Sequence, residues 1–501
     1  MLSKVWSAAV RGIDGFLVAV ELDLTNGLPC VNTVGLPDSS VREARERVVS
    51  AVRNSGFEFP CRRVTVNLAP AELRKGGTQF DLPIALGTLI ASEQVLPDTP
   101  SEGLCFLGEL ALDGSVRPVS GVLAMASSAR ARGLRGVVVP RANLGEASAV
   151  PGLEAYGVSS LKEAAEVLRG LREKSVEESV PESVQQEEFD LSEVRGQALA
   201  RRALEIAAAG GHSLLMSGPP GCGKSMLARR LIGVLPPLTQ EESLEVTRVY
   251  SVCGLLPAGA GLLRKRPFRA PHHTATATAL IGGGGNARPG EVTLAHRGVL
   301  FLDEFPEFGR DTLETLRQPL EDRTVTVTRL RESAVFPAEF TLVAAMNPCP
   351  CGYLGHPKRR CLCSEPVIRR YRGTVSGPMR ERIDLQVDLA PLPFGEWGSA
   401  KPGEPSSAVR ERVLKARAFA SRQGRSKPNT LLSPKEAREA CRIDSEGWSL
   451  LESLSRRSLS PRSLDRLLRS ARTVADLEES GAVRRGHLAE AAGFMGKWET
   501  L

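Results

Sequence analysis

Gly218-Pro219-Pro220-Gly221-Cys222-Gly223-Lys224-Ser225 is the stretch of this 501-residue chain that decides its fold class. It fits the pattern G-x-x-x-x-G-K-[ST], in which the backbone N–H groups of a glycine-rich loop cradle phosphate. A short, mostly apolar run at 213–216 predicts a strand before the loop, and the apolar spacing at 226–232 predicts a helix after it. Strand, loop and helix in this order predict an α/β core that binds the phosphates of a nucleotide.

The residues of the loop have separate expected tasks. We expect the Lys224 side chain to reach the β- and γ-phosphates of ATP and the Ser225 hydroxyl to bind Mg²⁺. The glycines let the backbone approach phosphate closely, because they carry no side chain. The other predicted nucleotide contacts are Gly218, Pro219, Pro220, Gly221, Cys222, Gly223 and Met226. The loop therefore predicts ATP and Mg²⁺ as cofactors.

A second apolar run, at 299–302, ends in the two acids Asp303 and Glu304. A buried strand would place Asp303 where it can hold Mg²⁺, and Glu304 where it can polarise the attacking water as a general base. An apolar strand that ends in acids is a weak signal on its own. Downstream of a phosphate loop, it predicts that the chain hydrolyses ATP.

The order of these motifs resembles that of the AAA+ ATPases, and the resemblance assigns three further residues. Asn347 follows an apolar run at the position of sensor 1, a polar group near the γ-phosphate. Arg382 lies at the position of the arginine finger, which reaches the γ-phosphate bound by a neighbouring subunit and makes hydrolysis depend on oligomerisation. Arg462 fits sensor 2, which completes the site of its own chain. The nearby alternatives to these two arginines are Arg380 and Arg466, respectively.

The composition is that of a globular protein outside the membrane. Hydrophobic residues make up 42% and charged residues 25% of a chain long enough for about three domains. No apolar stretch approaches the roughly 20 residues that span a bilayer, and residues 1–11 lack a signal-peptide pattern. We therefore expect a cytoplasmic protein with no membrane partner. The net charge of +7 suits the binding of a polyanion and equally suits a well-solvated surface.

Two changes in composition predict the domain boundaries. An acidic segment at 172–190 has almost no large apolar residues, which is typical of a solvated linker. Prolines at 391, 393, 402 and 405 interrupt regular structure near a second boundary. The predicted parts are an N-terminal domain at 1–171, the linker at 172–190, a nucleotide-binding core at 191–395 and a helical C-terminal lid at 396–501.

The N-terminal domain is predicted to mix strands and helices, with a helix that begins after the cap Asp38. Its Gly35-Leu36-Pro37 and the stretch 75–83 resemble the Lon-protease-like domain, which implies an α+β fold. Lon proteases carry a serine nucleophile in a Gly-Pro-Ser-Ala turn, and the corresponding stretch of this chain lacks that serine. Acyl-enzyme chemistry needs a nucleophile, so we expect a non-proteolytic version of the fold.

The segment between the two halves of the ATP site carries the most specific resemblance. Four segments, at 264–274, 279–285, 288–296 and 298–305, together closely resemble the ComM/YifB family of magnesium-chelatase-like AAA+ ATPases. The resemblance extends over nearly the whole chain. It departs locally at Arg380-Glu381-Arg382, where the family commonly has Leu-Asp-Arg.

This resemblance implies a hexameric ring motor on DNA, because ComM-like proteins are helicases that promote branch migration during uptake of transforming DNA. In this clade an insertion in helix 2 forms a hairpin directed at the ring pore, where basic residues contact phosphates and an aromatic ring stacks on bases. We expect His272, His273 and His296 to have structural or hairpin-positioning roles and not to bind a metal. A solvated basic loop is the alternative for the insertion. The candidate DNA contacts are Arg264, Lys265, Arg266, Phe268 and Arg269.

A cluster of cysteines follows Asn347. Four thiolates suit tetrahedral Zn²⁺, and the basic residues 358–360 would offset their charge. The spacing is not the usual Cys-x-x-Cys, so reduced thiols without a metal and disulfides stay open as alternatives. The two Cys-x-Cys pairs are Cys349, Cys351, Cys361 and Cys363.

Together these motifs favour an ATP-dependent motor that acts on DNA. A magnesium-chelatase-type ATPase that drives metal insertion into a porphyrin is the alternative, and the fused N-terminal domain and the cysteine loop argue against it. The missing serine disfavours a protease-coupled unfoldase. The full set of ATPase motifs disfavours a non-enzymatic scaffold.

Overall fold

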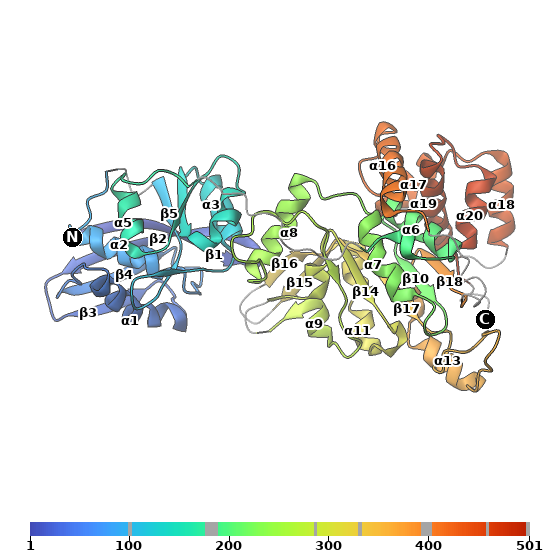
Figure 1. The fold of residues 1–501 in the computed structure, drawn as a ribbon, viewed down its shortest axis with the longest axis horizontal. Coiled ribbons are helices and arrows are strands. Elements are labelled where there is room, and N and C mark those ends of the chain that lie inside the picture. Colours follow the sequence, from blue (N-terminus) through green and yellow to red (C-terminus); the bar gives the residue numbers. More distant parts are fainter. Residues whose placement is uncertain are drawn as a thin grey trace. The chain divides into compact units, whose positions relative to one another are not determined.

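A computed structural model describes residues 1–98, 103–175, 189–284, 288–328, 333–391, 403–456 and 460–496 of the chain. The described residues form two compact units, and Figure 1 labels many of their elements. The N-terminal unit holds the described residues before 176 together with Thr239–Arg264, and the second unit holds 189–238 and the described residues from 265 onward. Residues 176–188 of the predicted linker lie outside the described residues.

The N-terminal unit is built on a seven-stranded mixed sheet with the order β3-β4-β2-β1-β5-β8-β9. β2 pairs antiparallel with β1 and with β4, while the other neighbouring strands pair parallel. Along β4, buried residues alternate with partly exposed ones, because successive side chains of a strand point to opposite faces. The strands are β1 (Leu2–Arg11), β2 (Asp14–Thr25), β3 (Cys30–Val34), β4 (Arg63–Ala69), β5 (Leu104–Phe106), β8 (Gly136–Pro140) and β9 (Glu154–Val158).

Helices cover both faces of this sheet. Val138 of β8 joins the hydrophobic core beneath α1, α2 and α5, while its neighbours Val137 and Val139 join the core beneath α3 and α4. As predicted, α1 follows the cap Asp38, whose carboxylate accepts a hydrogen bond from Val41 N at 3.0 Å. A short hairpin of β6 (Glu109–Leu110) and β7 (Val116–Arg117) precedes α3. The helices are α1 (Ser39–Asn54), α2 (Asp81–Ala91), α3 (Val122–Ala131), α4 (Leu144–Ser148) and α5 (Leu161–Leu168).

A segment from the middle of the chain completes the N-terminal unit. Helix α8 (Gln240–Val252) packs against α3, and Gly259 N donates to Ala142 O at 2.8 Å. The buried carboxylate of Glu146 accepts a hydrogen bond from Ser251 Oγ at 2.6 Å. A buried carboxylate needs such donors, so this contact ties α8 to the N-terminal unit. The structure therefore differs from the predicted core at 191–395, because residues 239–264 pack with the N-terminal unit instead.

The second unit contains a five-stranded parallel sheet with the order β11-β14-β17-β10-β18. Its central strands are fully buried, as the apolar runs before the phosphate loop, Asp303 and Asn347 predict. This parallel sheet fits the α/β fold of a P-loop ATPase of the AAA+ type. The strands are β10 (Leu214–Ser217), β11 (Phe268–Arg269), β14 (Val299–Leu302), β17 (Thr341–Met346) and β18 (Leu385–Asp388).

Helices and two small hairpins surround this sheet. α6 and α7 pack on it through a shared core, and the hairpin of β15 and β16 lies between α12 and β17 in the chain. The elements are α6 (Ala198–Gly210), α7 (Lys224–Val234), α9 (Ala277–Ile281), β12 (Gly282–Gly283), β13 (Arg288–Pro289), α10 (Glu291–Leu294), α11 (Arg310–Glu314), α12 (Arg317–Asp322), β15 (Thr324–Thr328), β16 (Ser333–Pro337), α13 (Glu365–Gly373) and α14 (Gly377–Arg380).

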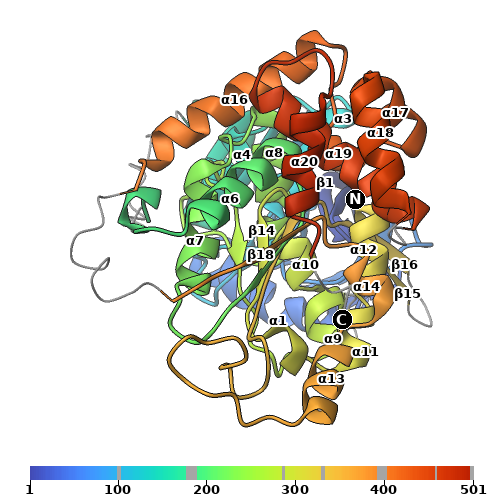
Figure 2. The same ribbon diagram turned by 90° about the vertical axis from the view of Figure 1, so that its right-hand side faces the viewer.

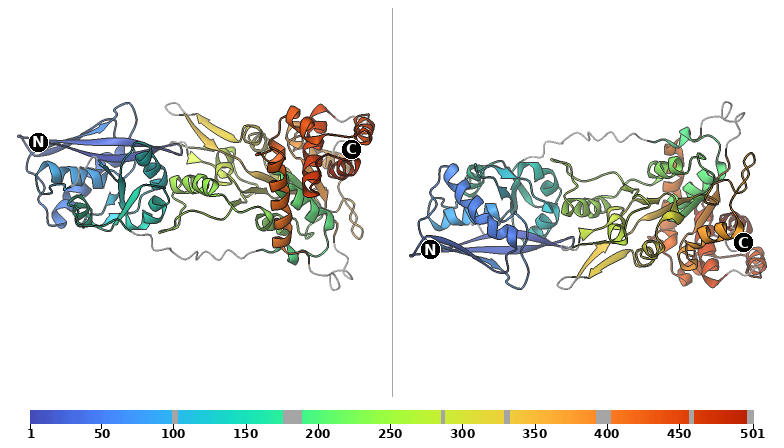
Figure 3. Two further views of the ribbon diagram at one scale, coloured as in Figure 1. Left: turned by 90° about the horizontal axis from the view of Figure 1, so that it is seen from above. Right: turned by 90° about the horizontal axis from the view of Figure 1, so that it is seen from below.

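The described residues from 403 onward are helical, as predicted, and they gather beside α6 (Figure 2, Figure 3). The lid helix α19 buries Asp476 between the guanidinium groups of Arg425 at 2.6 Å and Arg472 at 3.1 Å. Among the described residues, no helix is both long and apolar enough to cross a membrane. The lid helices are α16 (Ser406–Arg422), α17 (Pro434–Cys441), α18 (Ser445–Ser455), α19 (Pro461–Leu477) and α20 (Arg485–Gly493).

One buried ion pair ties α1 to α2 in the N-terminal unit. The guanidinium of Arg47 donates two hydrogen bonds to the Asp81 carboxylate, at 2.7 and 3.0 Å, and Leu110 N donates a third at 3.2 Å. The Asp81 side chain is only 1% exposed. Burial raises the pKa of Asp81, and the hydrogen bonds from Arg47 oppose that rise.

Replacing Arg47→Ala should destabilise the N-terminal unit by roughly 3 kcal/mol, because it leaves a buried carboxylate without its counterion. Hydrogen exchange at the Leu110 amide should accelerate accordingly. Arg45→Ala, on the exposed face of the same helix, is the matched control and should change the free energy of unfolding by about 0.5 kcal/mol or less. Equal exchange rates in the two variants would contradict the assigned role of the ion pair.

Candidate active site

Three parallel strands of the second unit end side by side. The registers of β10, β17 and β14 bring their carboxyl ends level on one edge of the sheet. Gly218 follows β10, Asp303 follows β14 and Asn347 follows β17. Ligands of open α/β sheets bind at this edge, so three segments that are distant in sequence meet at one candidate site.

The loop after β10 has a backbone suited to phosphate. Gly221 and Gly223 have φ angles of 78° and 92°, which glycine adopts without strain. A side chain at Gly218 would place its Cβ 2.7 Å from Leu389 O. Gly223 is the N-cap of α7, so the unpaired N–H groups of the first helical turn face the loop. These features fit the expected binding of nucleotide phosphates.

Lys224 lies at the centre of the site. Its Nζ donates to Gly218 O at 2.6 Å, to Pro219 O at 3.0 Å and to Asn347 Oδ1 at 3.0 Å. Burial lowers the pKa of this lysine, while the nearby acids Asp303 and Glu304 oppose the shift. The ammonium group is therefore held at the point where the phosphate loop and the end of β17 meet.

Ser225 and Asp303 face each other across the same site. The Ser225 hydroxyl donates to Asp303 Oδ2 at 2.7 Å, and the other carboxylate oxygen accepts a hydrogen bond from Glu304 N at 2.9 Å. The hydroxyl on the first turn of α7 and the carboxylate after β14 are oxygen ligands of the kind that Mg²⁺ takes beside phosphates. The residues present thus fit the magnesium ion expected from the sequence.

The Glu304 carboxylate contacts a histidine. Its Oε2 lies 3.0 Å from His273 Nδ1, and the ring of His272 lies 4.1 Å from that of His273. Glu304 itself has a left-handed backbone, with φ of 51°. For a residue other than glycine this conformation is uncommon and is found at functional sites. The sequence predicted a structural or hairpin-positioning role for His273, and its contact with Glu304 was not foreseen.

The remaining residues of the loop differ in their surroundings. Cys222 is 9% exposed and packs in the core of the unit, and this burial raises the pKa of its thiol. Met226 is 37% exposed on the first turn of α7. Pro220 lies against the segment that follows β17, because a Cβ at Gly352 would come within 2.6 Å of its ring.

The structure brings together two arginines that the sequence assigned to different sites. Arg382 and Arg462 both pair with Glu321, which ends α12, and the second contact is 3.1 Å long. Arg462 also contacts Glu381 at 3.3 Å. Since Arg462 shares its carboxylate with Arg382, the two side chains lie close together, with Arg462 exposed and Arg382 only 9% exposed. The sequence analysis gave Arg462 to the ATP site of its own chain and Arg382 to that of the neighbour, and this geometry does not separate them in that way.

Arg466, the alternative to Arg462, has a structural role. It is buried on α19, and its Nη1 donates to Arg380 O at 3.2 Å and to Ile383 O at 2.9 Å. These bonds tie the lid to the segment that carries Arg382. Of the two lid arginines, Arg462 is the exposed one and the better candidate for a contact outside its own chain.

The five candidate DNA contacts separate into two groups. Phe268 lies in β11, packs on the core and stacks on Phe301 with ring centroids 6.0 Å apart, so it is not an exposed base-stacking residue. Arg269 forms two hydrogen bonds with Glu291, at 2.6 and 2.8 Å. Arg266 donates to backbone carbonyl groups, at 2.6 Å to that of residue 236. All three side chains therefore have partners within their own unit, and DNA contact by them stays a prediction. The two exposed candidates are Arg264 and Lys265.

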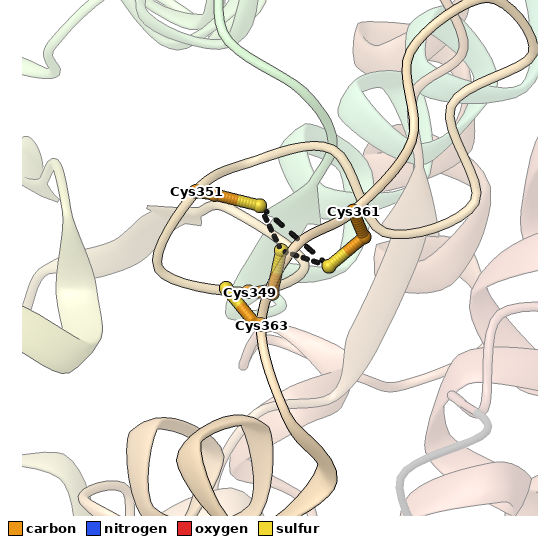
Figure 4. Close-up of side chains that lie close together, drawn as sticks. All are labelled: Cys349, Cys351, Cys361 and Cys363. Atoms are coloured by element: carbon orange, nitrogen blue, oxygen red, sulfur yellow. Dashed lines mark hydrogen bonds between the residues drawn. The ribbon is translucent and has the colours of Figure 1, made fainter.

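The four cysteines after β17 come together (Figure 4). Cys349 Sγ lies 3.3 Å from Cys351 Sγ and 3.6 Å from Cys361 Sγ, and the latter two are 3.6 Å apart. All four sulfur atoms, including that of Cys363, lie within 4.8 Å of one another. They are not joined as disulfides. Such a cluster can hold a metal ion.

The thiols of this cluster are not equivalent. Backbone N–H groups of Tyr353 and Leu362 lower the pKa of Cys351 to about 6. A hydrogen bond from the Cys363 backbone lowers the pKa of Cys361, but desolvation and the neighbouring thiols Cys349 and Cys351 outweigh it and raise the pKa to about 12. Four adjacent thiols therefore resist joint ionisation unless a cation compensates their charge.

A buried aspartate joins three parts of the second unit. Asp384, just before β18, accepts hydrogen bonds from Ser213 N at 3.1 Å and Thr430 Oγ1 at 3.1 Å, and it lies 3.4 Å from His212 Nδ1. His212 Nε2 lies 2.7 Å from Thr473 Oγ1 of the lid. Burial by itself would raise the pKa of Asp384, but these partners lower it to about 2. Sequence patterns gave no signal for Asp384 or for Glu321, because each lies outside any motif.

The fold and the site fit a P-loop ATPase of the AAA+ type. The loop after β10 carries Lys224 and Ser225, the end of β14 presents Asp303 to Ser225, and the end of β17 presents Asn347 to Lys224.

Comparisons with known proteins agree with this class. Family models described as "Magnesium chelatase, subunit ChlI", "Subunit ChlI of Mg-chelatase" and "Magnesium chelatase, subunit ChlI C-terminal" match residues 190–396, 20–143 and 403–495, respectively. The chain is 42% identical to competence protein ComM of Haemophilus influenzae over 98% of this chain and 97% of ComM. It is 41% identical to YifB of Escherichia coli over the same shares. An uncharacterized protein of Mycobacterium tuberculosis is 45% identical over 95% of each chain.

The chain therefore belongs to the ComM/YifB family of magnesium-chelatase-like proteins. The family was expected from the phosphate loop and the segments between Lys224 and Asp303, and the relatives confirm it.

Replacing Asp384→Asn should destabilise the second unit by roughly 2–3 kcal/mol at neutral pH. The folded pKa of about 2 lies below the ordinary value of 3.8, so the carboxylate stabilises the fold above about pH 4. That contribution is lost as the pH falls from about 4 to about 2. Urea unfolding from pH 7 downward checks this: the difference between wild type and variant should shrink below pH 4.

Asp388→Asn, exposed on β18, is the control and should leave stability within about 0.5 kcal/mol of wild type. A difference for Asp384→Asn that stayed constant with pH would contradict the assignment.

Proposed function

We propose that this protein is an ATP-dependent motor that acts on DNA as a homo-oligomeric ring, with six subunits as the expected number. The observation that carries the proposal is the meeting of Lys224, Asn347, Ser225 and Asp303 at one edge of the parallel sheet. Its cofactors are ATP and Mg²⁺, and its expected location is the cytoplasm.

Each residue of the site has a defined task in ATP hydrolysis. When bound, Mg²⁺ draws negative charge from the β- and γ-phosphate oxygens. Lys224 binds those phosphates, and Asn347, 3.0 Å from its Nζ, orients the ammonium group. Glu304 accepts the proton of the attacking water at a carboxylate oxygen, and His273 orients that carboxylate. Ser225 and Asp303 hold the magnesium side of the site.

The arrangement of the arginines supports a ring. Glu321 holds Arg382 and Arg462 close together. An arginine that stabilises the charge of a phosphoryl group in transfer works when its guanidinium reaches the γ-phosphate. We infer that the pair serves the ATP site of the neighbouring subunit, where phosphate replaces Glu321 as the partner of both guanidinium groups.

The proposal that DNA is the substrate rests on the positive charge of the chain and on the name of one relative. The chain has a net charge of +7 and exposes Arg264 and Lys265. Polyanion binding is electrostatic and weakens with salt. One close relative is named a competence protein, which agrees with the expected role of a branch-migration helicase in recombination and transformation. The descriptions of the matching family models favour the second candidate, an ATPase that drives metal insertion into a porphyrin.

The cysteine cluster adds a further expected cofactor. Soft thiolate ligands in a tetrahedral set favour zinc among the common divalent ions. We include one zinc ion in the proposed motor as a structural component, separate from the magnesium of the ATP site.

Mixing subunits tests the assignment of the arginines. Arg382→Ala and Glu304→Gln proteins should each lose ATP turnover by at least a hundredfold. Mixed rings should regain part of it, because some interfaces then combine an intact Glu304 with an intact Arg382 from the neighbour. The same recovery is expected for Arg462→Ala mixed with Glu304→Gln.

If mixing restored ATP turnover for Arg382→Ala but not for Arg462→Ala, Arg462 would be assigned to the ATP site of its own chain. Recovery with neither would contradict the ring geometry. Arg456→Ala, an exposed lid arginine, is the control that should keep full turnover without mixing.

A DNA-stimulated ATPase assay tests the proposed substrate. Single-stranded or branched DNA at low salt should raise ATP turnover severalfold, and the stimulation should fall steeply as salt rises. Lys224→Ala should abolish turnover with and without DNA. Arg264→Ala combined with Lys265→Ala should weaken DNA binding. If a metal-free porphyrin raised ATP turnover and DNA did not, the chelatase alternative would be supported and the DNA motor rejected.

A further inference from the structure

The sulfur atoms after β17 have the dimensions of a tetrahedral metal site. With Zn–S bonds of about 2.3 Å, the edges of a tetrahedron of sulfur atoms are about 3.8 Å long. The three closest sulfur pairs are separated by 3.3, 3.6 and 3.6 Å, and Cys363 Sγ lies within 4.8 Å of the others. Disulfide bonding requires about 2.05 Å. The spacing therefore fits thiolates gathered around one ion and fits no disulfide.

The loop that carries these cysteines also abuts the ATP site. It begins two residues after Asn347, and Gly352 N donates to Cys349 O at 2.9 Å in the turn between the first two cysteines. A Cβ placed on Gly352 would lie 2.6 Å from Pro220 Cδ and 3.8 Å from Asn347 Cγ. The turn held by Cys349 and Cys351 thus lies against both the phosphate loop and the residue that contacts Lys224.

Helix α13, which follows the cysteines, contacts the residues that lie between β17 and the first cysteine. On α13, Arg372 donates through Nε and Nη2 to Pro348 O, each at 3.2 Å. Tyr371 is 9% exposed and has a backbone hydrogen bond with Asn347, and burial raises its pKa to about 12. Both ends of the cysteine loop are therefore anchored at the end of β17.

The segment between the second and third cysteine has little other support. Residues 352–360 form no helix or strand, and their local bonds run from Lys358 N and Arg359 N to His356 Nδ1, at 3.0 and 3.1 Å. Arg359 also contacts the Tyr353 ring and donates to its hydroxyl at 2.7 Å. A loop with so few buried contacts needs a cross-link to hold its two ends, and a metal ion supplies one.

We propose that Cys349, Cys351, Cys361 and Cys363 bind one zinc ion, and that the loop closed by this ion holds Asn347 and Pro220 in the conformation that the ATP site requires. The ion is structural, since all four positions around it are taken by protein sulfur. The second half of this inference rests on the proposed ATP site, while the first half does not.

The basic side chains of the loop can balance the negative charge of a zinc ion bound by four thiolates. Zn²⁺ with four thiolates carries a net charge of −2, and Lys358, Arg359 and Arg360 supply three positive charges within the loop. Because the site is partly exposed, a cysteine–metal cross-link here is open to chelators and oxidants. Loss of the ion would therefore act on ATP turnover through Asn347, which is not itself a ligand.

Metal analysis of the full chain, purified without chelator, tests the first half. We expect about one zinc per chain, retained through dialysis and lost in Cys361→Ser. Cys61→Ser changes an exposed cysteine outside the cluster and is the matched control, which should keep its zinc. Cobalt substituted for zinc should give the visible absorption of a tetrahedral thiolate site. Full reactivity of all four thiols, with no bound metal in the wild-type protein, would overturn the proposal.

Nucleotide binding and basal ATP turnover, measured without DNA, test the second half. Removing zinc from the wild-type protein with a zinc-selective chelator should lower turnover by roughly tenfold to a hundredfold, and added zinc should restore it while added magnesium should not. Unchanged turnover after complete zinc loss would overturn the positioning role. This measurement does not depend on whether Cys361→Ser folds.

The variant Gly352→Ala tests whether the loop affects ATP binding when the zinc ion is still bound. The added Cβ clashes with Pro220 at a φ of 79°, so the variant should keep its zinc and yet bind ATP at least tenfold more weakly. Normal ATP affinity in this variant would contradict the contact between loop and site. If the wild-type protein neither binds nor hydrolyses ATP, the proposed function fails, and the zinc content still decides the metal site.

Discussion

The parallel alignment of β14, β17 and β10 is the constraint on which the rest of this structure depends. It brings the residues after three strands, Asp303, Asn347 and the loop at 218–223, to one edge of the sheet. Lys224 then has three oxygen partners within 3.0 Å, two from its own loop and one from the end of β17. Isolated segments could not create this arrangement, because each contributes only one wall of the site. The buried apolar strands keep the walls in register, and their burial stabilises the sheet from both faces.

Much of this edge could be predicted from the sequence, because its signals are local. The phosphate loop needs glycines at fixed spacing beside a strand and a helix, and the acid pair follows a recognisable apolar run. Long-range contacts carried no such signal. The sequence around Phe268 and Arg269 is typical of a basic, aromatic loop, but both residues lie in strand β11 of the sheet. There Phe268 stacks on Phe301 and Arg269 donates a hydrogen bond to Glu291. The packing of 239–264 with the N-terminal unit includes a hydrogen bond to the buried carboxylate of Glu146 and a backbone bond from Gly259 to Ala142, and no sequence spacing reveals either contact.

The same lesson applies to the arginines and the lid. Sequence position alone assigned Arg462 to its own chain, whereas Glu321 places it beside Arg382. Glu321 and Asp384 lie outside any motif, and yet one gathers the arginines and the other joins the lid to the start of β10. The buried contacts of Arg466 then connect the lid to the segment with Arg382. The lid and the segment that carries Arg382 are therefore joined by direct hydrogen bonds.

The most direct test of a shared ATP site is an experimental structure of the assembled protein with Mg²⁺ and a non-hydrolysable ATP analogue. We expect the γ-phosphate within hydrogen-bonding distance of Lys224 Nζ, with Asn347 beside it and with Arg382 supplied by the adjacent subunit. The magnesium ion should lie between Ser225 and Asp303. A nucleotide bound elsewhere, or a γ-phosphate contacted by Arg382 of the same chain, would contradict this expectation.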